Sequence, residues 1–221
     1  MSKEETTMPA KPVTYKDYVK EFLMGKIYEG KYKPGEKITV VGIAQELDVS
    51  QSVVREALAE LKVKKVIESI PYKETYIRNL SKEEVRDAIQ VRTEMEELAF
   101  KWILENQTNL SLLVKDLEEI LKEMRKSSSD TNSNTYREND ISFHRRIFIE
   151  AQSPTMLFIW DLLGDIGWIY LGLYTSQTFR QKMGEKEFSV ICDIYHDIIE
   201  SIEKRDLPRF SSLLRNTKLR V

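Results

Sequence analysis

The feature that most constrains the fold is a helical spacing of apolar residues along almost the whole chain, interrupted once. Apolar residues recur at three- and four-residue steps over residues 15–27, 41–47 and 53–61. Two short β-prone runs, at 66–70 and 75–77, then stand on either side of a polar turn. The first part of the chain is therefore predicted to run helix, helix, turn, helix, β-hairpin.

The rest of the chain shows helical periodicity only. Ser81 and Glu84 have the spacing of a capping box, which predicts that a helix begins there. Further helices are expected at about Leu110–Met124, Tyr136–Ala151, Thr155–Ser176, Lys186–Lys204 and Leu207–Lys218. We predict a mainly α protein, in which an N-terminal winged helix-turn-helix with a small β-hairpin precedes an all-α bundle of about six helices.

Length and composition fit two small domains. The chain has 221 residues, 41% of them apolar and 32% charged, a balance that excludes fibrous and wholly disordered classes. Residues 1–12 are polar, contain Pro9 and Pro12, and are interpreted as a flexible tail. We predict one domain over residues 13–79 and a second over 80–221.

Cysteine usage and the apolar segments indicate a cytoplasmic protein with no membrane partner. Cys192 is the only cysteine, so an intrachain disulfide framework is excluded. The first ten residues lack the layout of a signal peptide. The most apolar stretch, 156–174, is interrupted by Asp161 and Asp165, which favours a buried helix over a membrane span.

The segment Ile43–Leu61 has the layout of a helix-turn-helix, with a short helix, a tight break and a second helix. The second helix presents Ser50, Gln51 and Ser52 at its N-terminus. Backbone N–H groups and the helix dipole attract phosphate at such an end, and short side chains allow close approach to a groove. Arg55, one turn further, can reach a phosphate or a guanine edge. This pattern points to DNA.

Local charge supports DNA binding only weakly. The whole chain has a formal net charge of −2, so any DNA-binding face must be local. From Lys11 to Asn79 there are 13 basic and 10 acidic residues, a difference of +3. Basic residues gather after the second helix of the motif, at Lys62, Lys64, Lys65, Lys73 and Arg78.

Several blocks of the sequence resemble one known family. Residues 33–38 (KPGEKI), 43–50 (IAQELDVS), 54–58 (VREAL) and 66–67 (VI) resemble the winged-helix domain of the GntR family. Three later blocks resemble the ligand domain of its FadR-like branch, the FCD domain: Glu84–Glu96, Asp140–His144, and His196–Ile202 followed by Asp206. The resemblance covers roughly residues 15–218 and keeps the blocks in order.

The resemblance implies DNA contacts at particular residues, which are Ser50, Gln51, Ser52, Arg55 and Lys73. Two positions depart from the family pattern. Gln51 stands where members commonly have Arg, and because Gln pairs best with adenine, the guanine reading of the family is not expected. Glu74 stands where the wing tip commonly has Gly, and its charge would repel a phosphate wall unless it points away.

The resemblance also implies a metal ion. FCD domains that bind metal use one Asp and three His, and the first three positions correspond here to Asp140, His144 and His196. Asp140 and His144 lie four residues apart, on one face of a helix. The fourth position falls at Thr217, or at Asn216 with a one-residue slip, and neither is a strong ligand. We expect a three-ligand site for zinc, nickel or manganese; the alternative is a metal-free pocket in which both histidines form hydrogen bonds.

Arg92 and Asn216 are the candidate effector-binding residues. Arg92 matches an arginine that often faces the pocket in the family. Its guanidinium would suit a carboxylate effector through bidentate pairing. The alternative is a salt bridge from Arg92 to Asp140 or Glu96.

Together these features predict a ligand-responsive transcription regulator, not an enzyme, that binds a double-stranded DNA operator as a homodimer. A metal-dependent hydrolase using Asp140, His144 and His196 is the alternative from another class. The sequence shows no nucleophile motif, no Gly-rich phosphate loop and no spare Glu placed as a general base. A winged helix used only for protein contacts is a second alternative, and the basic residues near the wing argue against it.

Overall fold

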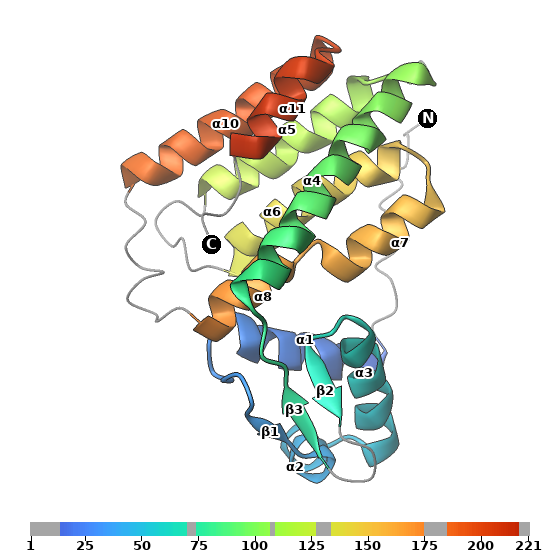
Figure 1. The fold of residues 1–221 in the computed structure, drawn as a ribbon, viewed down its shortest axis with the longest axis vertical. Coiled ribbons are helices and arrows are strands. Elements are labelled where there is room, and N and C mark those ends of the chain that lie inside the picture. The colour runs from blue at the N-terminus through green and yellow to red at the C-terminus, as the bar shows by residue number, and fades with distance from the viewer. Residues whose placement is uncertain (1–13, 70–73, 107–108, 127–133, 175–184, 217–221) are drawn as a thin grey trace, which may run out of the picture. The chain divides into compact units, whose positions relative to one another are not determined.

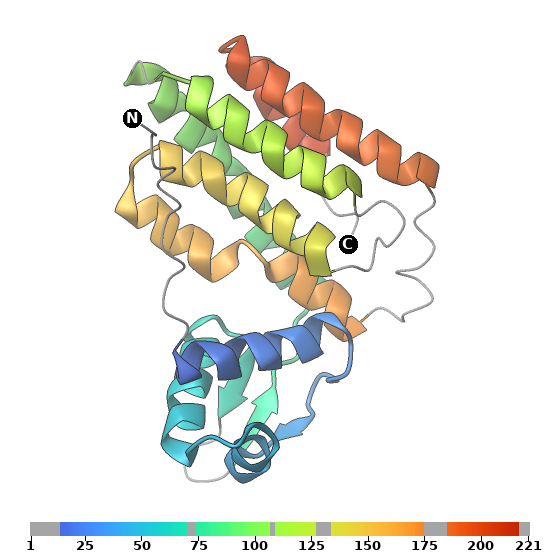
Figure 2. The same cartoon turned by 180° about the vertical axis from the view of Figure 1, so that it is seen from behind.

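The computed structural model describes residues 14–69, 74–106, 109–126, 134–174 and 185–216 (Figures 1 and 2). The chain divides into two compact units. The first contains the residues up to Lys26 and the segment Gly35–Arg78, and the second contains Ile27–Pro34 and the residues from Asn79 onward. The segment Ile27–Pro34, which the boundary predicted at residue 79 assigns to the DNA-binding domain, thus makes its contacts within the second unit.

The first unit is a winged helix-turn-helix. Its elements are α1 (Tyr15–Tyr28, whose end belongs to the second unit), β1 (Lys37–Ile38), α2 (Val40–Leu47), α3 (Gln51–Val63), β2 (Ile67–Ser69) and β3 (Thr75–Ile77). The strands form an antiparallel sheet in the order β1-β3-β2. The predicted hairpin is confirmed, and β1 adds a third strand that sequence periodicity could not show because it has only two residues.

Local sequence explains the turn between α2 and α3. Thr39 caps α2 by accepting a hydrogen bond from the Gly42 backbone N–H at 3.2 Å. A Cβ at Gly42 would lie 2.6 Å from Thr39 Oγ1, so a larger residue here would displace the capping hydroxyl. Asp48 ends α2 in the left-handed region, with φ of 51°, a conformation that Asp tolerates better than most residues. The chain then reverses into α3, which begins after Ser50.

The second unit is all-helical in its described residues. Its helices are α4 (Lys82–Glu105), α5 (Ser111–Lys126), α6 (Asn134–Glu150), α7 (Pro154–Leu163), α8 (Ile166–Tyr174), α10 (Glu185–Glu203) and α11 (Leu207–Asn216). The capping box predicted at Ser81 and Glu84 is confirmed. The long helix α4 contacts α6, α7, α8 and α11, and α5 packs between α6 and α10. Apolar residues from most of these helices share one buried core.

The single helix predicted over residues 155–176 is wrong. The structure divides this stretch into α7 and α8 at Gly164 and Asp165, so the second unit has seven helices in its described residues instead of six. The break frees the Gly164 carbonyl, which accepts a hydrogen bond from Arg92 Nη1 at 3.0 Å. Asp165 turns its side chain to the Tyr28 hydroxyl, which donates to Oδ2 at 2.7 Å. Arg92 thus supplies a donor to a backbone carbonyl at the break, whereas the Tyr28 contact satisfies only the Asp165 side chain.

One apolar stretch, Pro154–Tyr174, is long and apolar enough to cross a membrane by length and composition alone. Its mean hydropathy is 1.4, and 56% of the window is buried inside the protein. Because the stretch consists of two separate helices whose buried residues include Trp160 and Ile169, it is weak evidence for a membrane span and fits a helical core.

Candidate functional site

The residues at the N-terminus of α3 are polar and exposed, whereas one side of the same helix is buried. Ser50 caps the helix by accepting a hydrogen bond from the Val53 backbone N–H at 3.3 Å. Ser50, Gln51, Ser52 and Arg55 are all exposed. The opposite side of α3 is buried and fixes the helix on the unit, through Val54, Ala57, Leu58 and Leu61. An exposed helix N-terminus of this kind can bind phosphate and present short side chains to a DNA groove.

Gln51 and Arg55 act as a pair on this surface. Arg55 Nη2 donates a hydrogen bond to Gln51 Oε1 at 3.1 Å, one turn along the helix. The pairing uses the amide oxygen of Gln51 and one N–H group of Arg55, and both side chains are exposed. The pair can therefore offer donors to the acceptors of base edges or phosphates.

The negative charge of Glu74, which was expected to repel DNA phosphate, has partners in the wing. Glu74 forms an ion pair with Lys37 of β1 and accepts a hydrogen bond from the Tyr76 hydroxyl of β3. Its charge is therefore balanced within the sheet, which reduces the expected repulsion of a phosphate. Lys73 lies outside the described residues, so its predicted contact stays a prediction. Lys37, which sequence reasoning missed, adds a half-exposed cation beside the wing.

The second unit contains a buried polar cluster in its core. It consists of Glu96 of α4, Asp140 and His144 of α6, Trp168 of α8 and Tyr195 of α10. Asp140 accepts hydrogen bonds from the Tyr195 hydroxyl on Oδ1 and from Trp168 Nε1 on Oδ2, the latter at 2.6 Å. His144 Nε2 lies 3.3 Å from the Tyr195 oxygen, and His144 Nδ1 lies 2.6 Å from Glu96 Oε1.

The Glu96–His144 contact would be an ion pair only with a protonated imidazole, and its two atoms are not aligned for a hydrogen bond. The two atoms are within ion-pair distance, yet neither makes a directed hydrogen bond among the described residues. Glu96 and His144 are each only 1% exposed. Buried polar groups that are imperfectly paired are costly, so such a pair in a core points to a role beyond packing.

Burial and charge act together on the tyrosines beside Asp140. Burial, followed by the negative charge of Asp140, raises the pKa of Tyr195 well above its usual value of 10. The same two causes raise the pKa of Tyr136. Both phenols therefore stay protonated, and the Tyr195 hydroxyl remains a hydrogen-bond donor to Asp140.

The structure corrects the predicted place of His196. Tyr195, not His196, faces Asp140 and His144 from α10, and His196 is exposed. Successive residues on a helix are rotated by about 100°, so a shift of one position exchanges a buried side chain for an exposed one. The three residues assigned to a metal ion, or to a hydrolase, are thus not brought together.

The described residues do not fit the implied metal ion. They contain no group of three His, Cys, Asp or Glu side chains able to hold one. Asp140 and His144 are 3.8 Å apart, but both oxygens of Asp140 already accept hydrogen bonds, and a protonated phenol lies between the two side chains. Thr217 lies outside the described residues. The divalent ion stays a prediction without a matching donor set.

Arg92 lies at the edge of the buried polar cluster. Its guanidinium donates to the Gly164 carbonyl and stands 5.5 Å from the centre of the Trp160 ring. Its positive charge acts on Tyr195. The alternative salt bridge to Asp140 or Glu96 does not form, and Arg92 Nε is buried without a hydrogen-bond partner in the part of the chain that is described. Asn216 ends α11, and its side chain is not among those described.

Sequence reasoning missed Tyr195 and considered Glu96 only as a possible salt-bridge partner of Arg92, although helical spacing carries a signal for both. On α10 the buried residues follow steps of four and three, through Phe188, Cys192, Tyr195, Ile199 and Ile202. On α4, Glu96 falls in the buried series between Thr93 and Ala99. Following the helical spacing of the apolar residues along α10 would have placed Tyr195 in the core and His196 on the surface.

Comparison with known families agrees with this architecture. Residues 16–77 match the family described as bacterial regulatory proteins, gntR family. Residues 87–217, more than half of the chain, match the FCD domain. The two matches fall on the winged helix-turn-helix and on the helical unit respectively.

Known proteins with similar sequences include two described as repressors. A probable D-xylose utilization operon transcriptional repressor of Paenarthrobacter nicotinovorans is 26% identical over 151 residues, which is 68% of this chain and 66% of that protein, slightly under two thirds. The gluconate operon transcriptional repressor of Bacillus licheniformis is 27% identical over 181 residues, 82% of this chain and 72% of that protein.

Solved structures show the same fold. E. coli McbR/YncC aligns with a TM-score of 0.73 at 20% identity, covering 93% of each chain. A GntR-type regulator from Rhodococcus aligns with a TM-score of 0.65 at 19% identity, over 91% of this chain and 92% of that one. The winged helix-turn-helix, the helical unit and the two family matches together show that the chain belongs to the GntR family of bacterial regulatory proteins, in the branch that carries an FCD domain.

Proposed function

We propose that this protein is a homodimeric, ligand-responsive transcription regulator of the cytoplasm, which represses by binding a double-stranded DNA operator. Repression is inferred from two relatives whose names describe them as repressors. The observation that carries the DNA-binding part is the exposed N-terminus of α3, where the side chains of Ser50, Gln51, Ser52 and Arg55 are exposed on a helix whose opposite side is buried. Two half-sites bound by one dimer multiply the small affinity of a single winged helix.

The effector is proposed to be a small organic acid bound beside Arg92. Three features support this: the buried Arg92 Nε without a partner, the tyrosine hydroxyl and histidine of the buried polar cluster, and the flat Trp160 ring next to the guanidinium. A carboxylate could pair with the Arg92 guanidinium and lie beside the Trp160 ring. Coupling between effector and operator is typically about 1–3 kcal/mol.

The test of DNA binding starts with a selection of genomic fragments by the purified protein, with and without carboxylates. An inverted repeat should be enriched. Arg55→Ala should weaken operator binding by roughly 1–3 kcal/mol if Arg55 reads a base. Arg86→Ala, a loss of an exposed arginine on α4, serves as the matched control and should leave binding unchanged. Failure to enrich any site in any condition would refute the regulator function.

Effector binding is tested by a thermal-shift screen of carboxylic acids. Hits should lose most of their affinity with Arg92→Ala and part of it with Arg92→Lys, since lysine keeps the charge but lacks the bidentate fork. Acids that bind both variants as tightly as the wild type would exclude Arg92 from the site.

A further inference from the structure

We propose that α8 is a clamp on two connections that lead from the second unit into the first, and that Arg92 sets this clamp. The two connections are the end of α1, at residues 27–28, and the segment before α4, at residues 79–80. Both belong to the second unit, and each adjoins a point at which the chain enters the first unit. The proposal rests on the proposed regulator and names the way in which its effector acts on operator binding.

The start of α8 holds the end of α1. The Tyr28 hydroxyl donates a hydrogen bond to Asp165 Oδ2 at 2.7 Å. Asp165 also begins α8, because its backbone carbonyl accepts a hydrogen bond from the Ile169 N–H at 3.0 Å. Further along α8, a Cβ at Gly172 would lie only 2.1 Å from the Ile27 carbonyl oxygen. The backbones of α1 and α8 are therefore in close contact, and a larger residue at position 172 would push them apart.

The end of α8 holds the other connection. The Tyr174 hydroxyl accepts a hydrogen bond from the Leu80 backbone N–H at 2.8 Å and donates one to the side-chain oxygen of Asn79. The Tyr174 ring stacks on that of Tyr170, one turn earlier, with ring centres 4.6 Å apart. Because α8 has only nine residues, a displacement at its start is passed along the helix to Tyr174 at its end.

Arg92 holds the break that precedes α8. Its Nη1 donates to the carbonyl of Gly164, the residue directly before Asp165. Its Nε is buried without a hydrogen-bond partner in the described part of the chain, so the guanidinium still has a donor to offer. A carboxylate is a stronger acceptor for a guanidinium than a neutral carbonyl. An acid bound at Arg92 therefore draws the guanidinium away from Gly164 and removes this support from the start of α8.

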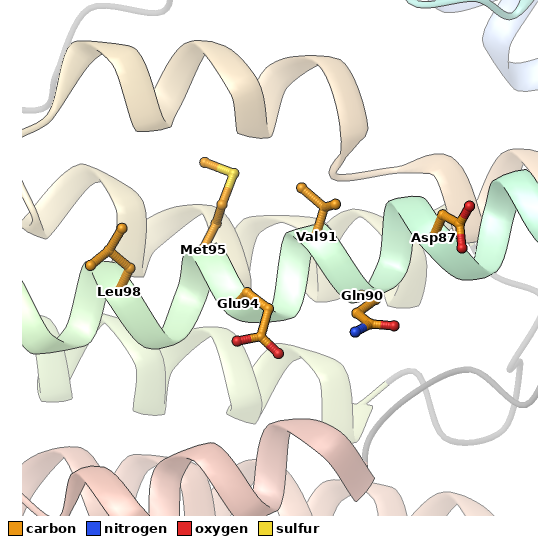
Figure 3. Close-up of a pocket in the computed structure, with 6 residues that line it drawn as sticks. All are labelled: Asp87, Gln90, Val91, Glu94, Met95 and Leu98. Carbon is orange, nitrogen blue, oxygen red and sulfur yellow. The ribbon is translucent and has the colours of Figure 1, made fainter.

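The position of the acid follows from the direction in which Arg92 points. Figure 3 shows a hollow of about 510 Å³ along α4, lined by Asp87, Gln90, Val91, Glu94, Met95 and Leu98. Arg92 is not one of these residues, and its guanidinium turns to Gly164 and Trp160. An acid in the hollow would leave the Gly164 contact in place, so the clamp responds only to an acid at the guanidinium itself.

α1 links the clamp to the DNA-binding helix. Lys16 and Lys20 of α1 form ion pairs with Glu60 of α3, each at 2.5 Å. Val19 and Leu23 of α1 are fully buried. The helix that α8 holds at its end is thus packed along its body within the first unit. A dimer reads two half-sites at a fixed spacing, so releasing the connections lowers the fraction of molecules that are ready to bind both.

Amide hydrogen exchange of the full chain, without DNA or effector, tests whether α8 joins the two connections. Tyr28→Phe removes only a hydroxyl at the start of α8, and it should speed exchange of the Leu80 N–H at the opposite end about tenfold. Tyr174→Phe should likewise speed exchange of the Gly30 N–H, which bonds to the Ile27 carbonyl at 3.0 Å. If each variant alters only the connection that it touches, α8 is not a common clamp and the proposal is wrong.

Matched controls accompany these variants. Tyr170→Phe removes a hydroxyl of α8 that takes part in neither connection, and it should leave both amides as they are in the wild type. Gly172→Ala should speed both, whereas Gly25→Ala, on α1 where the described residues place no atom within 4 Å, should change neither. The Arg78 N–H, bonded to the Val66 carbonyl at 2.9 Å in the first unit, is the internal reference and should stay constant.

Arg92→Ala tests whether Arg92 sets the clamp. The substitution removes the donor to the Gly164 carbonyl, so exchange of the Leu80 and Gly30 amides should become about tenfold faster. Arg86→Ala, at an exposed position of the same helix, should change neither amide. Exchange in Arg92→Ala that is as slow as in the wild type would show that Arg92 does not act on α8.

The closing measurement is fluorescence anisotropy with the operator DNA found by the fragment selection. Tyr28→Phe, Tyr174→Phe and Arg92→Ala should each raise the dissociation constant at least about fivefold. Asp165→Asn keeps an oxygen that accepts from the Tyr28 hydroxyl and should stay close to the wild type. Unchanged operator affinity in the three variants would overturn the link from clamp to DNA and leave the regulator function standing. If no operator is found, the regulator function itself fails, while hydrogen exchange still decides for or against the clamp.

Discussion

The start of α3 and the buried polar cluster are two candidate sites built in opposite ways. The α3 site consists of neighbouring residues of one helix, all exposed, from Ser50 to Arg55. The buried polar cluster brings together side chains of α4, α6, α8 and α10, with His144 and Glu96 almost fully enclosed. At the first site, the local sequence is enough to identify the residues that form the site and to place them on the helix. At the second, they depend on the rotation and register of several helices.

Because the two sites differ in this way, a substitution at the first should change binding alone, and a substitution at the second should change binding and stability together. A substitution at the start of α3 changes what the surface can bind, while the helix stays fixed by its buried side. A substitution in the buried polar cluster removes a hydrogen-bond partner from the core, so binding and folding change together.

The largest expected effect is that of Asp140→Ala. The substitution leaves the Trp168 N–H and the Tyr195 hydroxyl without their acceptor in a buried site, which should destabilise the helical unit by roughly 3–5 kcal/mol. Chemical denaturation followed by near-ultraviolet circular dichroism, which reports the partly buried Trp168 and the buried Tyr195, measures this loss.

Asp161→Ala is the matched control for that experiment. Asp161 pairs with Arg145 at 2.9 Å, and its side chain is 50% exposed. Exposed ion pairs contribute about 0–1 kcal/mol, so the control should unfold close to the wild type. Equal destabilisation by the two variants would mean that the buried hydrogen bonds add little, and the contrast between the sites would disappear.

The sequence allowed prediction of the α3 site in its essentials and of the cluster only in part. Ser50 as a helix cap could be predicted because capping is local chemistry. Asp140 and His144 could be placed on one face because they belong to one helix. Tyr195 was missed because the choice between positions 195 and 196 depends on the rotation of α10, which only the series of buried residues reveals. The break at Gly164 was missed because its compensating bond comes from Arg92, far away in sequence.

The second largest expected effect is a gain of metal binding by the variant Tyr195→His. An imidazole at position 195 would replace the phenol beside Asp140 and His144 and complete one carboxylate and two imidazoles. At zinc concentrations one hundred times the dissociation constant, binding should stabilise this variant by about 2.7 kcal/mol over its metal-free form. Elemental analysis and thermal unfolding with and without chelator measure the gain.

Two further variants make the metal experiment decisive. Tyr195→Phe should gain no metal, because it removes the hydroxyl without adding a ligand. His196→Ala, in the background of Tyr195→His, should leave the zinc content unchanged, since His196 is exposed. Stoichiometric metal in the wild type that disappears with His196→Ala would show that the placement of His196 outside the cluster is wrong.

The smallest expected effects come from the two serine caps, which distinguish a structural cap from one that also faces DNA. Ser50→Ala removes the hydrogen bond to the Val53 N–H at the start of α3, and Ser81→Ala removes the one to the Glu84 N–H at the start of α4. Each should cost about 1 kcal/mol, and Ser81→Ala somewhat less, because the Glu84 side chain still accepts from the backbone N–H of residue 81.

Aspartate at the same two positions separates the roles. Ser50→Asp and Ser81→Asp both keep a capping acceptor and place a negative charge at the positive end of a helix, so both should retain wild-type stability. Only Ser50→Asp sets that charge against the DNA phosphates, and it should lower operator affinity at least tenfold while Ser81→Asp leaves it unchanged. Thermal unfolding and fluorescence anisotropy with operator DNA give the two readouts. If Ser50→Asp binds the operator as tightly as the wild type, the N-terminus of α3 does not face the phosphate backbone, and the exposed site loses the function that its chemistry predicts.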